Sequence, residues 1–293
     1  MPKVHSLFRF PGGKQKFSKH ITGRISDFIA EHQDYEYRET FAGSLGTGLA
    51  LLSQPHVKRG WINDKDFGVA SIWNAVLNKP DALCQLIEQF KPTAQAFYEF
   101  KEYLKQDPRI STDDFVVIGF RKLAIHQISY SGLGTMSGGP LGGDDQKSDY
   151  KIDCRWNAKT LVRKVKVLHH LLKDKLRNAV CSWRDVVDML EAPGKAFFYL
   201  DPPYYVNGPE LYEKSFTEED HKRLSDALKE VDQPWILSYD DCEEIRALYE
   251  WAIIIDFQMN YTITTSRQKS ELLIVSPKFS ELAVTETLAP IQF

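Results

Sequence analysis

The sequence predicts an α/β fold in which a parallel sheet flanked by helices is interrupted by an inserted, mostly helical module. Strand and helix patterns alternate over residues 35–77, lapse, and resume as strand-like segments after residue 178. The chain has 293 residues, 43% of them hydrophobic and 26% charged, which is enough apolar material for a large core. We therefore expect a sheet domain from residues 1–90 and 178–293, with residues 91–177 inserted into it.

The first part of the sheet domain repeats a strand-then-helix pattern. Apolar residues at helical spacing predict the helices, and short apolar runs predict the strands. The expected elements are a helix at 15–33, a strand at 35–41, a strand at 59–63 and a helix at 67–77 that Asn78-Lys79-Pro80 ends.

The inserted module and the second part of the sheet domain follow. The module contains a loop, residues 131–143, with six glycines in thirteen residues, which rules out a regular element there. Its expected helices lie at 94–104, 115–126 and 160–172, and the remaining strands at 179–183, 196–200, 235–238, 252–258 and 271–275.

Charge and cysteine usage narrow the class of protein. The net charge is −3, yet Lys3–Arg24 holds six basic residues and no acidic one, and a second basic stretch runs from Lys159 to Arg177. Such segregation permits a nucleic-acid-binding face. The four cysteines lie far apart, and no apolar run is long enough for a membrane span or a secretory signal. We expect a cytoplasmic protein with reduced thiols and no metal.

A glycine-rich turn after the first strand predicts a site for a nucleotide-like ligand. Ala42-Gly-Ser-Leu-Gly-Thr-Gly48 joins the strand at 35–41 to a helix start, where glycines let the backbone approach a ligand. Asp64 ends the next strand 21 residues after Gly43, the offset at which doubly wound folds bind a ribose diol. Leu49 stands where a phosphate-binding loop needs lysine, which excludes that motif. An ordinary turn is the alternative.

Two further segments carry residues suited to binding. Pro11-Gly12-Gly13-Lys14 combines two glycines with a lysine at an expected helix start, although a capped turn has the same spacing. Asp201-Pro202-Pro203-Tyr204 directly follows the strand at 196–200. Because the two prolines have no N–H to donate, this loop offers carboxylate and carbonyl acceptors beside an aromatic ring. That combination suits the amino group of a flat base, and a rigid proline-rich turn is the alternative.

With these segments, the chain resembles the D12 class of DNA adenine-N6 methyltransferases. The resemblance rests on Phe-Arg-Phe-Pro-Gly-Gly-Lys (8–14), Thr-Phe-Ala-Gly-Ser-Leu-Gly-Thr-Gly (40–48), Ile-Asn-Asp-Lys-Asp (62–66) and Leu-Asp-Pro-Pro-Tyr-Tyr (200–205), in the family's order. Glu271–Val275 also resembles the family's last core strand. The resemblance implies a Rossmann-like sheet that binds S-adenosylmethionine, with a target-recognition insertion ahead of the catalytic loop.

The resemblance also implies roles for single residues. Asp64 would contact the ribose of S-adenosylmethionine, Asp185 its adenine, and Asp201 both the cofactor and the target amine. Thr40 departs from the family pattern because an acidic residue is common there, and Glu39 lies one position earlier. Phe10 also departs, since many members have Trp. The implied cofactor-binding set is Phe10, Pro11, Gly12, Gly13, Lys14, Phe41, Ala42, Gly43, Asp64, Asp185 and Asp201; the catalytic set is Asp201, Pro202, Pro203 and Tyr204.

The implied reaction is direct methyl transfer to an adenine flipped out of the duplex. Asp201 and the Pro202 carbonyl would accept hydrogen bonds from the N6 amino group, and Tyr204 would stack on the base. For DNA contact we expect Tyr130, Arg155 and Asn157 to read or wedge bases, and Lys159, Arg163 and Lys166 to contact phosphates together with His170, Lys173 and Arg177 on the same helix face. A solvated charged face and a disordered connector at 131–143 are the alternatives.

The predicted function is site-specific methylation of adenine N6 in double-stranded DNA. It fits a restriction-modification system, with a partner endonuclease for the same site, or a phage or orphan modification enzyme, in a bacterial or phage-infected cell. We expect a monomer or weak dimer. An acceptor in RNA or protein, or a catalytically silent DNA-binding regulator, is the alternative; intact Asp201, Tyr204 and Asp64 favour the enzyme. The recognition sequence would be encoded in residues 91–177.

Overall fold

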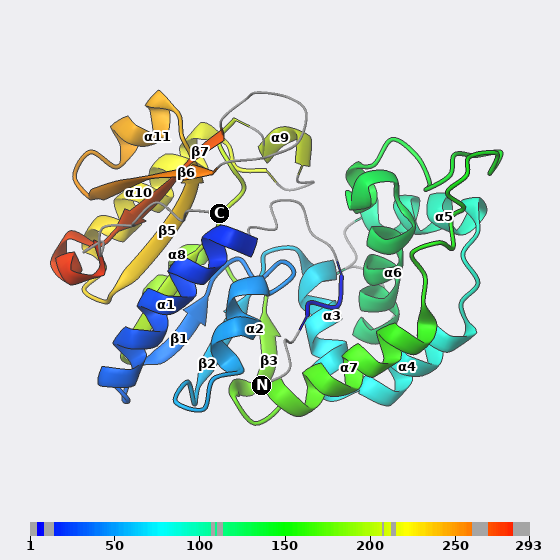
Figure 1. The fold of residues 1–293 in the computed structure, drawn as a ribbon, viewed down its shortest axis with the longest axis horizontal. Coiled ribbons are helices and arrows are strands. Elements are labelled where there is room, and N and C mark those ends of the chain that lie inside the picture. The colour runs from blue at the N-terminus through cyan, green and yellow to red at the C-terminus, as the bar shows by residue number, and fades with distance from the viewer. Residues whose placement is uncertain are drawn as a thin grey trace, which may run out of the picture.

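A mostly parallel seven-stranded sheet forms the centre of the part of the chain that the computed structural model describes, residues 5–8, 15–106, 109, 114–206, 208–211, 215–259 and 269–283 (Figure 1). The strand order is β3-β2-β1-β4-β5-β7-β6, and only the pairs that involve β7 are antiparallel. The predicted α/β fold is therefore confirmed. The strands are β1 (Glu36–Glu39), β2 (Gly60–Asn63), β3 (Leu176–Ser182), β4 (Ala196–Leu200), β5 (Trp235–Asp240), β6 (Ile253–Met259) and β7 (Lys269–Val275).

Helices follow most of the strands and cover both faces of the sheet. They are α1 (Gln15–Glu31), α2 (Gly46–Leu52), α3 (Phe67–Asn78), α4 (Pro80–Gln89), α5 (Ala94–Lys105), α6 (Phe115–Ile128), α7 (Ala158–Leu172), α8 (Val186–Leu190), α9 (Gly208–Leu211), α10 (Glu218–Glu230) and α11 (Glu243–Leu248). Short 3₁₀ turns lie at Tyr130–Gly132, Gly134–Met136 and Pro277–Ala283. Within the described ranges, no helix is long and apolar enough to cross a membrane.

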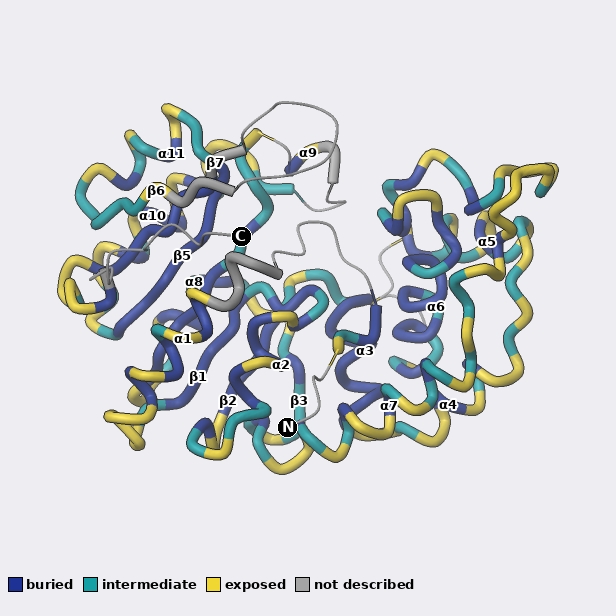
Figure 2. The backbone as a smooth tube through the Cα atoms, in the orientation of Figure 1, coloured by how far each residue is buried: buried dark blue, intermediate teal, exposed yellow. Residues whose placement is uncertain are grey.

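Alternating side chains of the central strands divide the core into two layers. In β4, Phe197 and Tyr199 pack with α1, α2 and α3, whereas Phe198 and Leu200 pack with α8, α10 and α11. All five residues of β4 are buried, as expected for a parallel strand covered on both faces. Its neighbours β1 and β5 are buried as well, and they are dark blue in Figure 2. Burying each of the large apolar side chains of β4 contributes roughly 2–3 kcal/mol. The two layers therefore hold the ends of the strands in fixed positions.

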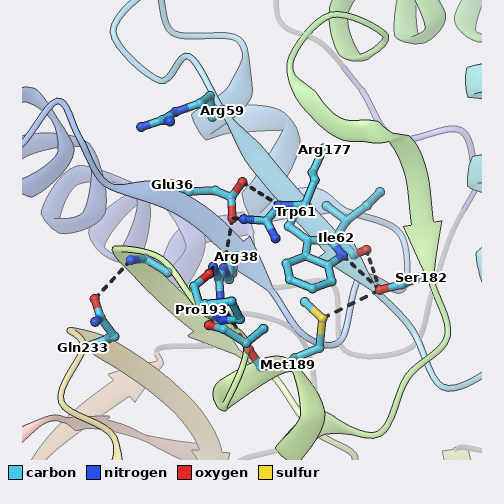
Figure 3. Close-up of polar contacts among 12 residues, drawn as sticks. Glu36, Arg38, Arg59, Trp61, Ile62, Arg177, Ser182, Met189, Pro193 and Gln233 are labelled. Carbon is cyan, nitrogen blue, oxygen red and sulfur yellow. Dashed lines mark hydrogen bonds and ion pairs between the residues drawn. The ribbon is translucent and has the colours of Figure 1, made fainter.

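A buried arginine ties β1 to the segment that follows α8 (Figure 3). The Arg38 side chain is inaccessible to solvent, and its guanidinium donates to the carbonyls of Ala192 and Pro193 at 2.8 and 2.7 Å and to Glu36 at 2.9 Å. Arg177 binds the same Glu36 carboxylate at 3.1 Å. Arg177 therefore lies in β3 as part of this cluster, and the expectation that it shares the basic face of the preceding helix is wrong.

Helix α6 connects the sheet domain to the predicted insertion. Its Gly119 lies so close to α3 that an added Cβ would be 2.6 Å from the Ser71 carbonyl oxygen. Phe120 and Leu123 belong to the main core, whereas Ile125 and Ile128 belong to a small cluster with α5. Helix α6, inside the predicted insertion, therefore packs against both α3 and α5, and the boundaries at residues 90 and 178 and the role of residues 91–177 in recognition stay predictions.

Candidate active site

The candidate site lies between β1 and β4, where the order in which the chain adds strands to the sheet reverses direction. From β1 the chain continues to β2 on one side, and β4 continues to β5 on the other, so the carboxyl ends of β1 and β4 are neighbours. In open α/β sheets, ligands bind at such a switch point, beyond the carboxyl ends of the strands. The glycine-rich turn follows β1 and the Asp201–Tyr204 loop follows β4, so the fold brings two of the predicted segments together.

Asp64 shapes the glycine-rich turn. Its Oδ2 accepts a hydrogen bond from the Gly43 N–H at 2.8 Å, and its Oδ1 accepts one from the Asp66 N–H at 2.9 Å. Gly43 has a φ of 43°, a conformation that glycine adopts without steric cost. Burial raises the pKa of Asp64 to about 7. The carboxylate thus organises the predicted ligand turn, while its contact with a ribose stays a prediction.

Glu39 is a buried acid for which the family resemblance implies no role. It is 3% exposed at the end of β1, and its Oε2 accepts a hydrogen bond from the Tyr37 hydroxyl at 2.8 Å. The backbone N–H of Gly48 also bonds to it, and burial raises its pKa to about 8. A Cβ at position 48 would overlap the Glu39 carboxylate, which explains why that helix position holds glycine. Glu39 therefore fixes the start of α2 below the turn.

Phe41 and Asp185, from the predicted cofactor-binding set, line a pocket at the carboxyl ends of β1, β2 and β3. Within it, the Thr40 hydroxyl is buried and has no hydrogen-bond partner among the residues that the structure describes. Asn63 holds the rim by donating to the carbonyls of Thr40 and Arg184, at 3.2 and 3.1 Å. The lining residues are Thr40, Phe41, Asn63, Lys65, Arg184, Asp185, Val186, Phe216, Asp220, Arg223 and Leu224.

Asp185 lines this pocket but already has partners. It caps α8 by accepting a hydrogen bond from the Val187 N–H at 3.1 Å, and it forms an ion pair with Arg223 at 3.0 Å. Burial acts to raise its pKa, but the Val187 N–H and the cations Arg223 and Lys65 outweigh that effect and lower the pKa. Asp185 is therefore a carboxylate at neutral pH, and an adenine amino group there would share it with Arg223.

The Asp201–Tyr204 loop is anchored by β5. The Ser238 hydroxyl donates to Asp201 Oδ1 at 3.0 Å, and the Asp240 carboxylate accepts hydrogen bonds from the backbone N–H groups of Tyr205 and Val206 at 3.0 and 2.9 Å. The Tyr204 ring lies 6.3 Å from the ring of Tyr239, centroid to centroid. Ser238 and Asp240 were not predicted, because a sequence does not show which strand will lie beside β4.

Residues 5–8, just before the N-terminal motif, contact the glycine-rich turn. Residues 10–14, which include the predicted Phe10, Pro11, Gly12, Gly13 and Lys14, lie outside the described residues. Just before them, Leu7 and Phe8 are buried in the main core, and the Ser6 hydroxyl donates to the Ser44 carbonyl at 2.6 Å. Residues 6–8 are therefore fixed against the core and the glycine-rich turn.

An ion pair links this edge of the sheet to α6. Asp66 caps α3 by accepting hydrogen bonds from the N–H groups of Gly68 and Val69, and it binds Lys122 at 2.6 Å. The Lys122 side chain is 5% exposed. One turn further along α6, His126 Nδ1 lies 3.0 Å from the Gly132 carbonyl oxygen, so α6 contacts both Asp66 and the glycine-rich loop at 131–143.

The glycine-rich loop at 131–143 is ordered. The Tyr130 N–H donates to the Gly139 carbonyl at 3.1 Å, and Ser137 donates back to the Tyr130 carbonyl at the same distance. Gly134 has a φ of 62°, and an added Cβ would be 2.8 Å from the His126 ring. The alternative of a disordered connector is therefore wrong, and at least Gly134 serves internal packing.

The predicted DNA-contacting residues lie at two different places. The Tyr130 side chain is 67% exposed at the end of α6, beside the ordered loop. Asn157 caps α7 through a 2.9 Å hydrogen bond from the Thr160 N–H, and Arg155 is half-buried. Lys159, Arg163 and Lys166 are exposed on α7, and none forms an ion pair with another described residue.

The direction of α7 separates its far end from the candidate site. The helix ends at Leu172 and β3 begins at Leu176, so this end of α7 lies near the amino ends of the parallel strands. The Asp201 loop lies beyond their carboxyl ends. His170 and Lys173, at this end of α7, therefore lie away from the Asp201 loop.

The comparison with known families accords with this geometry. A family model described as D12 class N6 adenine-specific DNA methyltransferase matches residues 10–263, which include the glycine-rich turn, Asp64 and the loop after β4. None of the curated proteins matches the chain. Among the described residues, no group of three or more His, Cys, Asp or Glu side chains could hold a metal ion. The chain belongs to the D12 class of N6 adenine-specific DNA methyltransferases, enzymes that methylate the N6 amino group of adenine in DNA.

Proposed function

We propose that the methyl donor is S-adenosylmethionine and that the acceptor is an adenine flipped out of double-stranded DNA at a specific site. The single observation that carries this proposal is the Asp201-Pro202-Pro203-Tyr204 loop at the switch point of the sheet, with its acid bonded to Ser238. The loop presents acceptors and an aromatic ring, the groups that an exocyclic amine on a purine requires.

The residues around the switch point fit S-adenosylmethionine. Phe41 offers an aromatic face and Asp185 an acceptor for an amino group in the same pocket. Asp64 keeps further acceptor capacity for a ribose diol beside Gly43. The cofactor supplies a methyl group bound to a positively charged sulfur. The Asp201 carboxylate, at the neighbouring strand end, would face both this charge and the target amine.

The chemistry of the loop follows from its acceptors. Adenine N6 is a weak nucleophile because its lone pair is delocalised into the ring. Hydrogen bonds from its two N–H groups to Asp201 and to the Pro202 carbonyl would favour a less conjugated nitrogen. Positioning of this kind supplies several kcal/mol of a barrier. Flipping the base costs a few kcal/mol, of which stacking on Tyr204 would return roughly 1–3 kcal/mol.

We further propose that DNA lies against the end of α6 and the start of α7. The exposed Tyr130 ring suits a wedge between bases, because its backbone is held by Gly139 and Ser137. Arg155, Asn157 and the cations Lys159, Arg163 and Lys166 lie beyond the ordered loop and would contact bases and phosphates.

Transfer of tritiated methyl groups tests the function. Purified protein is incubated with labelled S-adenosylmethionine and with DNA from a methylation-free bacterium, total RNA or an unrelated protein. We expect label only in DNA, recovered as N6-methyladenine, and we expect Asp201→Ala to reduce it by at least about 100-fold. Asp188→Ala, an exposed acid on α8, is the matched control. Absence of label from DNA would overturn the proposal, and label in RNA or protein would move the acceptor.

A further inference from the structure

The catalytic loop has few backbone groups with which to hold its shape. Pro202 and Pro203 have no N–H, so over residues 202–206 only three backbone N–H groups exist, those of Tyr204, Tyr205 and Val206. Asp240 accepts hydrogen bonds from two of the three, one on each carboxylate oxygen, at 3.0 and 2.9 Å. A single side chain therefore supplies the acceptors for most of the loop's backbone donors.

Asp240 is placed for this task by β5. It is the last residue of the strand, 8% exposed, and it lies two positions after Ser238, so the two side chains point to the same face of the sheet. Ser238 is fully buried and donates to Asp201 at 3.0 Å. Two alternate residues of β5 thus hold the loop: Ser238 bonds to Asp201 at its start, and Asp240 bonds to the backbone of Tyr205 and Val206 at its end.

The underside of the loop is also packed. The Tyr205 ring lies 5.0 Å from the ring of His221, and His221 Nδ1 lies 2.6 Å from the Tyr239 hydroxyl, all within or beside the second core layer. Tyr204 lies between Pro203, whose ring fixes φ, and Tyr205, whose N–H is held by Asp240. The backbone at Tyr204 is therefore restricted on both sides.

We propose that Asp240 is a positioning residue for methyl transfer, which acts by fixing the backbone at Tyr205 and Val206 so that Tyr204 and Asp201 meet the target base in one orientation. This inference rests on the proposed function of the loop. Charge-assisted hydrogen bonds from backbone N–H groups to a carboxylate are stronger than neutral ones, so a buried aspartate suits the task better than an amide. Asp240 itself need not touch the base.

The first test compares Asp240→Ala and Asp240→Asn with wild type. A displacement of about 1 Å in a catalytic group costs on the order of 100-fold in rate, so we expect Asp240→Ala to lower kcat by about that factor. Asn keeps one acceptor oxygen, so Asp240→Asn should lower kcat by about 10-fold. Because Asp240 lies outside the Thr40 pocket, the Kd for S-adenosylmethionine should change by less than about twofold in either variant. Asp232→Ala, an exposed acid before the other end of β5, is the control.

A double-mutant cycle separates positioning from general destabilisation. If Asp240 acts through Tyr204, Asp240→Ala should cost less than about fivefold in kcat when Tyr204 is already alanine, because residues that act as a unit are not additive. Additive losses, or full kcat in Asp240→Ala, would overturn this inference while the wild-type enzyme still methylates DNA. An inactive wild type would instead overturn the proposed function.

Discussion

The buried acid Glu39 makes a prediction about how stability depends on pH. Burial raises its pKa from 4.5 to about 8 in the folded protein, whereas in the unfolded chain it titrates near the ordinary value. The folded state therefore binds the proton more tightly. The contribution to stability is full below pH 4.5 and is lost as pH rises toward 8. Each pKa unit corresponds to about 1.4 kcal/mol, so the complete loss amounts to about 4–5 kcal/mol.

Replacing Glu39 with Gln removes this dependence. The amide oxygen can still accept the hydrogen bonds of Tyr37 and Gly48, but the side chain no longer ionises. Between pH 5 and pH 9 we expect the free energy of unfolding of wild type to fall by about 4 kcal/mol more than that of Glu39→Gln. Because Asp64 titrates in the same range, the difference between the two proteins is the quantity to compare.

Urea unfolding in buffers from pH 5 to pH 9, at constant ionic strength, measures this difference. Glu31→Gln is the matched control, since Glu31 is exposed at the end of α1 and should follow wild type at every pH. Parallel curves for wild type and Glu39→Gln would refute the reasoning, because they would mean that Glu39 is ionised in the folded protein throughout this range.

Two further predictions concern buried polar groups at the same edge of the sheet. Lys122→Met removes the buried partner of Asp66 and should lower the free energy of unfolding by about 2–3 kcal/mol. The loss is moderate because Asp66 remains partly solvated. Urea unfolding measures it, and a loss below about 0.5 kcal/mol would contradict the prediction. The Thr40 hydroxyl is buried without a hydrogen-bond partner among the described residues, so Thr40→Val should raise the free energy of unfolding by about 1 kcal/mol. Urea unfolding measures this change with Thr40→Ser, which keeps the hydroxyl, as the control, and a Thr40→Val protein no more stable than wild type would contradict the prediction.

The sequence predicts the strands better than the contacts between them. The apolar run at 196–200 matches β4 residue for residue, because a parallel strand covered on both faces must be apolar throughout. Helix α4 was missed for a local reason: Asn78-Lys79-Pro80 predicts the end of a helix, but Pro80 occupies the first turn of the next one, where its missing N–H costs nothing.

The first part of β3 was missed for a different reason. The chain has positive φ angles at Asn178 and Ala179, 55° and 49°, and the pairing with β2 shifts register there. Apolar alternation breaks at such an irregularity, so the pattern predicts only the regular part after it. The strand in fact begins at Leu176.

In the candidate site too, residues in local sequence patterns were predicted, whereas residues that matter through contacts between strands were not. Asp64, Phe41 and the Asp201 loop carry local patterns, and the fold gathers them at one edge of the sheet. Ser238 and Asp240 carry none, because their importance comes from the pairing of β4 with β5, which is a property of the whole topology. The basic face of α7 is visible in the sequence, but the position of the end that carries His170 and Lys173 follows only from the direction of β3.

The shared packing of α6 has a consequence for exchanging target specificity between relatives. The main core includes Phe120 and Leu123 of α6 and Leu161 and Val165 of α7. Exchanging residues 91–177 for those of a relative would therefore replace side chains on which the sheet packs. Residues 129–157, between the end of α6 and the start of α7, contribute Trp156 only at the margin of that core. A chimaera cut at these two points would exchange the segment that carries Tyr130, Arg155 and Asn157, which we propose contact DNA, and would keep the native α6 and α7 beneath it.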